Sequence, residues 1–108
     1  QRYLKRNTSL PDAIIAFNDS VALGILEAWK IASGSNHPPP FALTGWDDSP
    51  SSSVIGLTSV SIPYFQLGEE SARLLHQRIN GPVTDHGQHR LVDLTLIPRS
   101  SSQRVHHA

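Results

Sequence analysis

Short apolar runs alternate with longer amphipathic segments along this chain of 108 residues. The apolar runs are residues 13–17, 41–44, 57–62 and 91–97, and the amphipathic segments are residues 20–32 and 64–79. Short continuous apolar runs are typical of parallel strands that are covered on both faces, and apolar residues at helical intervals are typical of helices that pack on a sheet. The order strand, helix, strand, strand, helix, strand therefore predicts an α/β fold in which helices flank a parallel sheet.

The residues around the two amphipathic segments support helices there. Asn18 and Asp19 precede the first segment, and short polar side chains at that place accept hydrogen bonds from the free amides of a first turn. Gly34 is a suitable end for this helix. The second helix is expected to begin after Pro63 and to end at residues 80–82, where Asn, Gly and Pro follow one another.

Two helices are too few to cover three or four apolar strands on both faces. The chain contains no methionine, so Gln1 is not an initiator residue, and residues 1–10 resemble the end of a helix whose beginning is absent. We therefore expect the chain to be a fragment of a larger protein. Within it, residues 49–53 are expected to form a polar loop, and a tail without regular structure is expected from Ser100 onward.

The composition excludes several classes of function. Nine basic and nine acidic residues give a formal net charge of zero, and the basic ones are mostly scattered, whereas a surface that grips nucleic acid needs clustered Lys and Arg. The chain has no cysteine, so it holds no disulfide, Cys-ligated metal or thiol nucleophile. No apolar run approaches the ~20 residues that cross a bilayer, and no signal peptide is visible at the start.

The residue types that are most often catalytic or metal-binding form no constellation typical of an enzyme. The six histidines include His86, His89 and residues 106–107, without companion ligands at zinc spacing. Asp47 and Asp48 are compatible with an acid–base pair or a hard metal site, but no partner side chain stands nearby in sequence, and a turn is favoured. The chain contains no Gly-rich phosphate loop and no nucleophile elbow. We expect no enzymatic activity, no cofactor and no bound metal.

Two of the predicted strands end in residues suited to binding hydroxyl groups. Asn18 ends the first apolar run, and Asp47 follows the second. Open α/β sheets bind ligands at the carboxyl ends of their strands, where an amide both donates and accepts hydrogen bonds and a carboxylate accepts them. A second interpretation of Asn18 is a helix cap, and the two roles are compatible.

Four segments of the chain carry a series of short motifs. Residues 11–24 match the pattern P-x-A-I-x-x-x-N-D-x-x-A-x-G, and residues 45–48 match G-aromatic-D-D. Residues 57–75 match L-T-T-V…L-G…A…L-L, with a serine in place of the second threonine. Residues 94–101 are similar to L-x-x-R-x-S. They occur in one order, at approximately regular spacing, over most of residues 11–101. In these motifs the chain resembles the effector-binding domain of the LacI/GalR family of bacterial transcription regulators.

The resemblance implies a portion of a two-lobed, periplasmic-binding-protein-like (type I) fold, with parallel sheets flanked by helices and a ligand in the cleft. Residues 1–101 would be the C-terminal part of the effector-binding domain, and residues 102–108 a disordered tail. Residues 11–61 would belong mainly to the C-terminal lobe, residues 63–81 would be a helix of the N-terminal lobe, and residues 90–99 would form a crossing strand. A DNA-binding helix-turn-helix would lie upstream, outside this chain.

The resemblance also assigns site residues. The expected ligand-binding residues are Asn18, Trp46, Asp47 and Tyr64, and the expected dimer-interface residues are Leu23, Val54 and Ile55. Asn18 and Asp47 match positions that hydrogen-bond effector hydroxyls in this family. Tyr64 matches a position where an aromatic ring packs against the ligand, and Trp46 replaces the commoner Phe or Tyr of its motif.

By this resemblance the chain is the sensing part of a cytoplasmic, homodimeric, ligand-responsive regulator. Its effector would be a sugar or a similar small polar metabolite, and the dimer would reach operator DNA through the upstream helix-turn-helix, with no membrane partner. The alternative is a periplasmic solute-binding protein of a sugar transporter, which shares the fold. The residues 57–60 and the closing R-x-S-S of residues 99–102 favour the regulator.

Overall fold

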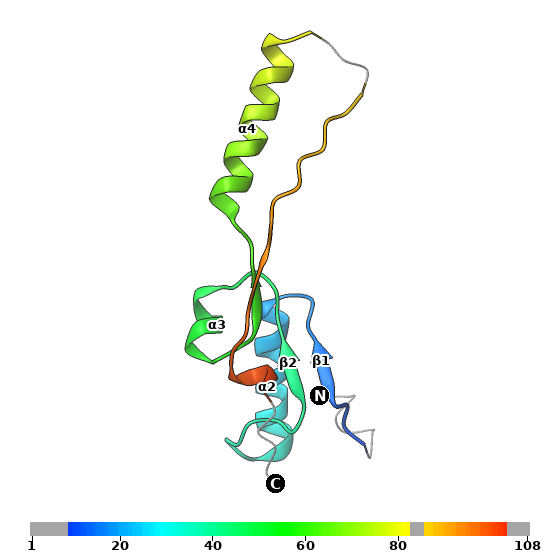
Figure 1. Ribbon diagram of the computed structural model, residues 1–108. Helices are drawn as coiled ribbons and strands as arrows, with labels where there is room; N and C mark the ends of the chain where they lie inside the picture. The colour runs from blue at the N-terminus through cyan, green and yellow to red at the C-terminus, as the bar shows by residue number, and fades with distance from the viewer. Residues whose placement is uncertain (1–8, 83–85, 104–108) are drawn as a thin grey trace. The chain divides into compact units, whose positions relative to one another are not determined.

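The computed structural model describes residues 9–82 and 86–103. Its elements are β1 (Ala13–Ile15), α2 (Asp19–Ser33), β2 (Ala42–Thr44), the short helix α3 (Pro50–Val54), β3 (Ser59–Ser61), α4 (Tyr64–Asn80), β4 (Thr95–Ile97) and the 3-10 helix η1 (Ser100–Ser102) (Figure 1). The predicted α/β alternation is confirmed. The expected helix end at residues 1–10 lies almost wholly outside the described residues.

The chain divides into two compact units. Unit 1 consists of residues 1–61 and 96–108, and unit 2 consists of residues 62–95. The chain therefore leaves unit 1 after β3 and returns to it within β4. Each unit has its own secondary structure, and the strands that pair all lie in unit 1 except for Thr95.

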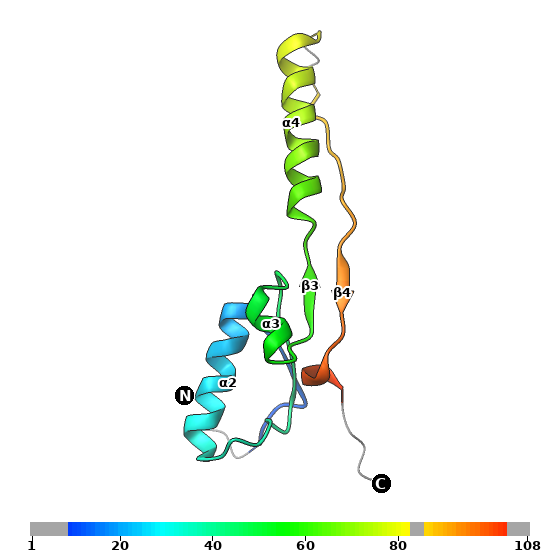
Figure 2. The same ribbon diagram turned by 90° about the vertical axis from the view of Figure 1, so that its left-hand side faces the viewer.

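A parallel sheet forms the frame of unit 1. β1 pairs with β2 in parallel. Parallel bridges join Thr44 to Thr58 and Asp47 to Ser61, so the ladder continues from the β2 side to β3. β3 also pairs with β4, and Figure 2 shows these two strands side by side. Because the strands are parallel, the residues that follow β1 and β2 meet at one edge of the sheet.

The core of unit 1 lies between this sheet and α2. Ile14 stands opposite Leu43 in the register of β1 and β2. The buried cluster, against which Ile14, Ile25 and Leu26 pack, consists of Ala16, Ala22, Leu43 and Leu57. Successive side chains of a strand point to opposite faces, so Ile15 and Phe17 turn away from this cluster, and each is 86% exposed. Within the described residues, one face of the sheet is thus left uncovered, as the small number of helices predicted.

The two ends of α2 carry the signals that the sequence predicted. The Asn18 side-chain oxygen accepts a hydrogen bond from the Val21 amide at 2.9 Å, which makes Asn18 the N-cap. Gly34 follows the last turn with a φ of 63°, a left-handed conformation that glycine adopts without steric cost, and its amide donates to the Lys30 carbonyl. The helix cap predicted for Asn18 is confirmed.

Unit 2 consists of α4 and the segment that returns from it. Described residues 86–94 run without regular structure, although Arg78 donates a hydrogen bond to the His86 carbonyl at 3.4 Å. Within the part of the chain that the structure describes, no residue of α4 is buried. Its exposed apolar side chains include Tyr64, Phe65, Leu67, Leu75 and Ile79. This helix therefore has an apolar face that unit 2 does not cover by itself.

Two predicted irregular segments turn out to be short helices. Residues 50–54 form α3, with Pro50 in its first turn, where its fixed φ suits a helix and its missing N–H is not needed. The tail predicted from Ser100 begins with η1, in which the Ser102 hydroxyl lies 2.6 Å from that of Thr58. Both segments are ordered by tertiary hydrogen bonds that the local sequence does not reveal. Residues 104–108 of the predicted tail lie outside the described residues.

The last predicted strand is shorter than expected. Apolar alternation predicted a strand over residues 91–97, whereas β4 contains only Thr95–Ile97. β3, its partner, is itself only three residues long, from Ser59 to Ser61. A strand needs a neighbour for its backbone hydrogen bonds, and residues 91–94 have none among the described residues, which explains the prediction's error.

Candidate functional site at the carboxyl edge of the sheet

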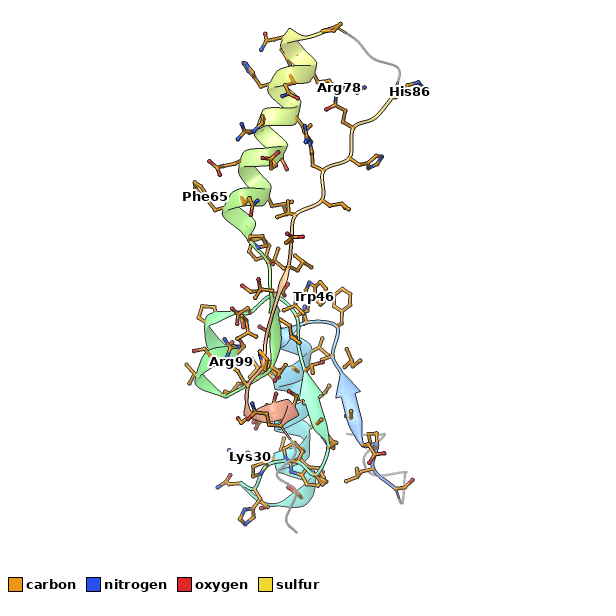
Figure 3. All side chains as sticks on the ribbon, viewed as in Figure 1. Lys30, Trp46, Phe65, Arg78, His86 and Arg99 are labelled. Carbon is orange, nitrogen blue, oxygen red and sulfur yellow. The ribbon has the colours of Figure 1, made fainter. Side chains whose placement is uncertain are left out.

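A shallow pocket opens at the edge of the sheet where β1 and β2 end. It is lined by Phe17, Asn18, Trp46 and Asp47. The Asp19 amide donates a hydrogen bond of 2.9 Å to the Trp46 carbonyl. This bond joins the segment that follows β1 to the segment that follows β2. Three residues predicted to bind ligand therefore lie together, and Figure 3 labels Trp46 at this edge. Phe17 was not predicted as a site residue, because its place in an apolar run suggested a buried strand.

Tyr64, the fourth predicted ligand-binding residue, belongs to the other unit. It is the first residue of α4, and it is exposed. The pocket described above is formed by residues of unit 1 alone. The role of Tyr64 thus stays a prediction.

The turn that carries Asp47 has an uncommon backbone conformation. Asp47 has a φ of 106° and Asp48 has a φ of 51°. Both values lie in a backbone region that residues other than glycine rarely adopt. The Asp47 amide donates to the Val60 carbonyl at 3.0 Å, and the Asp48 amide donates to the Ser59 hydroxyl at 3.0 Å. Strain of this kind persists where surrounding contacts hold it and is concentrated at functional sites.

The two adjacent carboxylates of the turn have different environments. Asp48 forms an ion pair with Arg99, with 2.7 Å between Oδ1 and Nη2, and it also accepts a hydrogen bond from Ser52 at 3.2 Å. The hydrogen bond from Arg99 lowers the pKa of Asp48 below its ordinary value, against a smaller opposing effect of burial. Asp48 is therefore a structural anion, whereas Asp47 lines the pocket.

Arg99 reaches Asp48 from the segment after β4, and Figure 3 labels it beside α3. Its Nη1 donates to the Leu57 carbonyl at 2.8 Å and to the Ser52 hydroxyl at 3.1 Å. One guanidinium thus binds a carboxylate, a carbonyl and a hydroxyl at once, which its planar array of donors permits. Arg99 belongs to the closing motif of the sequence, but its partner was not predicted.

Asp19 is the second charged residue that the sequence did not assign to the site. Its side chain is nearly buried, with 2% of the residue exposed. Its two oxygens accept hydrogen bonds from the Ser59 hydroxyl and from the Ser49 amide, each at 2.6 Å. A buried carboxylate needs such partners. The position of Asp19 directly after an apolar strand could have indicated a role at the site. The sequence did not decide for this role, because an acidic residue also suits the first turn of a helix.

Gly45 explains how Asp19 can approach the turn so closely. A side-chain carbon at position 45 would overlap with the Asp19 carboxylate, and it would lie 3.0 Å from Leu57 Cδ2. Only glycine leaves room for the carboxylate beside the end of β2. The glycine of the motif at residues 45–48 thus has a steric reason in this structure.

The predicted dimer-interface residues differ in exposure. Leu23 of α2 is half-buried, whereas Val54 of α3 is 85% exposed and Ile55 is also exposed. Apolar side chains that stand in solvent remain available to a partner surface. Their role as an interface stays a prediction.

The described residues contain no group of three or more His, Asp or Glu side chains arranged to hold a metal ion. Nor does any helix in the described ranges have the length and apolarity required to cross a membrane. His106 and His107 lie outside those ranges.

Similarity to known proteins identifies the family. A family model described as a periplasmic binding protein-like domain matches residues 1–102. The lactose operon repressor of Rhizobium radiobacter is 32% identical over 96 residues, which cover 87% of this chain and 82% of that protein. The chain belongs to the LacI/GalR family of transcription regulators. The family inferred from four sequence motifs is thereby confirmed.

Other LacI-family proteins match the same segment. The probable HTH-type transcriptional regulator EndR of Paenibacillus polymyxa is 42% identical over 81 residues, or 70% of this chain. A LacI family transcriptional regulator from Enterococcus faecium, solved with bound ribose, has a TM-score of 0.71 and 27% identity over 88% of this chain. The chain spans 23% of the length of EndR and 35% of that of the Enterococcus chain. The predicted α/β fold, a portion of a periplasmic-binding-protein-like domain, is thereby confirmed.

Proposed function

We propose that this chain is the effector-binding part of a ligand-responsive transcription regulator, and that it binds a sugar-like molecule at the carboxyl edge of its sheet. The observation that carries the proposal is the pocket lined by Phe17, Asn18, Trp46 and Asp47. It combines a carboxylate, an amide and two aromatic rings. Carboxylate and amide groups bind hydroxyls, and aromatic rings provide the apolar surface that small-molecule sites need.

Asn18 serves both as a cap and as a ligand-binding residue in this proposal. The cap uses the side-chain oxygen, which accepts from the Val21 amide at 2.9 Å. The side-chain NH2 group carries two further N–H donors, which suit hydroxyl oxygens. Asp47 supplies the complementary acceptor, so one hydroxylated ligand finds both kinds of partner at this edge.

The bounds of the two units support the proposed division into lobes. Unit 1 ends at Ser61 and resumes at Leu96, close to the bounds 11–61 and 90–99 predicted for the C-terminal lobe and the crossing strand. Unit 2 includes the helix predicted for the N-terminal lobe. The proposed ligand-binding role of Tyr64, the first residue of α4 in unit 2, rests on the sequence resemblance.

The relatives favour a regulator over the alternative, a solute-binding protein of a transporter. The matched proteins are named as a repressor and as transcription regulators, and one regulator was solved with ribose. We therefore infer an intact protein that acts in the cytoplasm, binds operator DNA through an upstream helix-turn-helix and has no enzymatic activity. Its effector shifts an equilibrium between two conformations by binding them unequally.

A thermal-shift screen of the full-length protein tests the ligand class. Sugars, polyols and nucleosides are compared with amino acids and nucleobases at millimolar concentration. A ligand at 100 times its Kd adds about 2.7 kcal/mol to the free energy of unfolding, so a hydroxylated effector is expected to raise the Tm by several degrees. If only amino acids or nucleobases raised the Tm, the sugar-like ligand would be ruled out.

A homodimer is expected to form through α2 and α3. Changing Leu23 to Lys places a charge among apolar contacts, so Leu23→Lys is expected to convert the full-length dimer into monomers in analytical ultracentrifugation. The matched control is Ala32→Lys, because an exposed residue nine positions further along α2 lies on the opposite side of the helix. A wild-type protein that already sediments as a monomer at micromolar concentration would contradict the prediction.

A further inference from the structure

The turn from Trp46 to Ser49 donates hydrogen bonds to two other segments, β3 and the start of α2. Its three successive amides each donate: that of Asp47 to the Val60 carbonyl at 3.0 Å, that of Asp48 to the Ser59 hydroxyl at 3.0 Å, and that of Ser49 to the Asp19 carboxylate at 2.6 Å. Two consecutive non-glycine residues in this turn have positive φ. Such a conformation is unfavourable by itself, so these acceptors are what keep it in place.

Ser59 connects two of these hydrogen bonds. It is fully buried, and its hydroxyl donates to Asp19 at 2.6 Å while it accepts from the Asp48 amide. A hydroxyl has one proton, so the buried Asp19 carboxylate fixes the direction in which that proton points. The lone pairs of Ser59 are thereby turned toward the Asp48 amide.

Arg99 holds the same turn by the side chain of Asp48. Its Nη2 lies 2.7 Å from Asp48 Oδ1, and its Nη1 donates to the Leu57 carbonyl at 2.8 Å. The Leu57 carbonyl belongs to the backbone just before β3, so the guanidinium ties Asp48 to a fixed point of unit 1. Charge-assisted hydrogen bonds of this length are stronger than those between neutral groups.

We propose that Asp19, Ser59 and Arg99 are positioning residues that hold the Trp46–Asp48 turn, and with it Asp47, in the conformation that binds the effector. This inference rests on the proposed function only for its ligand. None of the three lines the pocket, whose residues are Phe17, Asn18, Trp46 and Asp47. They act on Asp47 through the backbone of the turn.

Amide hydrogen exchange of the ligand-free, full-length protein tests whether these residues hold the turn. In Arg99→Ala and in Ser59→Ala, the amides of residues 47–49 are expected to exchange about tenfold faster or more. Each variant lacks hydrogen bonds that must break before the turn opens, so local opening costs less free energy. The amides in the middle of α2 should keep their rates. Arg99→Lys restores the charge but not the planar array of donors, so its rates should lie between those of the wild type and Arg99→Ala.

Matched controls come from the exposed ion pair and hydroxyl of α4. Arg73→Ala removes a pair with Glu70 at 3.6 Å, and Ser71→Ala removes a hydrogen bond to the Leu67 carbonyl. Neither should change exchange at residues 47–49. Unchanged exchange there in Ser59→Ala and Arg99→Ala would overturn the proposal, and so would an equal acceleration throughout unit 1. If Arg99→Ala does not fold, Ser59→Ala and Arg99→Lys still decide the outcome.

A double-mutant cycle links the positioning residues to Asp47. The probe is the compound that raises the wild-type Tm most in the thermal-shift screen. Arg99→Ala is expected to weaken its binding about as much as Asp47→Gly does, and the double variant should lose little more than either single variant. Additive losses would overturn the proposed action through Asp47. If the screen finds no hydroxylated compound, the proposed function fails, while the exchange rates still show whether the turn is held.

Discussion

Loss of the Asp47 carboxylate is expected to weaken effector binding by about 10- to 150-fold, since a hydrogen bond to a charged group contributes roughly 1.5–3 kcal/mol. The structure determines which substitution tests this. Asp47 has a φ of 106°, a conformation that is strained for any residue with a Cβ, so alanine would keep this strain, whereas glycine removes the carboxylate and suits that φ. Asp47→Gly should therefore remain folded and lose affinity for the hydroxylated compound that stabilises the wild type.

Calorimetry of the full-length protein measures the effect, with two controls. Asp47→Asn keeps a side-chain oxygen but loses the charge, and it should lose less affinity than Asp47→Gly. Asp93→Gly removes an exposed carboxylate from unit 2 and should bind as the wild type does. A folded Asp47→Gly protein with unchanged affinity would show that Asp47 is not a ligand-binding residue.

Residues 1–108 expressed alone are expected not to fold as a stable monomer. Ile15 of β1 and Phe17 just after it are each 86% exposed, and no described residue of α4 is buried. Among the described residues of unit 1, the buried apolar cluster consists of four side chains, two of which are alanine. Exposed apolar faces favour aggregation, and even complete small domains have only a few kcal/mol of net stability.

The measurement is denaturant unfolding of this segment, followed by circular dichroism, together with its amide NMR spectrum. We expect a shallow, non-cooperative transition, poorly dispersed amide signals and concentration-dependent association. The full-length protein, unfolded under the same conditions, is the control and should show a cooperative transition. A soluble monomer of 1–108 with a sharp two-state transition would contradict the prediction and would show that this segment covers its own core.

The strands, helices and family follow from patterns that are local in the sequence. An apolar run, a capping Asn18 and a terminal Gly34 each act within a few residues, so α2 and the strand before it could be predicted from the sequence alone. The two motifs at residues 11–24 and 45–48 also placed three of the pocket's residues, Asn18, Trp46 and Asp47, at one edge. The carboxyl ends of parallel strands lie at the same edge of a sheet, so the predicted strands were enough to bring the residues after them together.

The distinction between Asp47 and Asp48 could not be predicted in this way. The two carboxylates are adjacent and chemically identical, and the partner that binds Asp48 in an ion pair, Arg99, lies 51 residues away in the sequence. The same is true of η1, since Ser101 donates to the Leu43 carbonyl at 2.6 Å across 58 residues. No local pattern encodes such a partner.

What the sequence determined by itself is therefore the order of the two long helices and the strands, the family, and the edge at which we propose that a ligand binds. Periodicity, capping and turn preferences act between near neighbours, and these decide such features. Only the tertiary structure decided that Asp19, Ser59 and Arg99 form hydrogen bonds with the Trp46–Ser49 turn, that residues 50–54 and 100–102 are helical, and that β4 begins only at Thr95. Each of these depends on a hydrogen-bond partner brought close by folding, and the energy of such a contact is set by distance in space, not by separation along the chain.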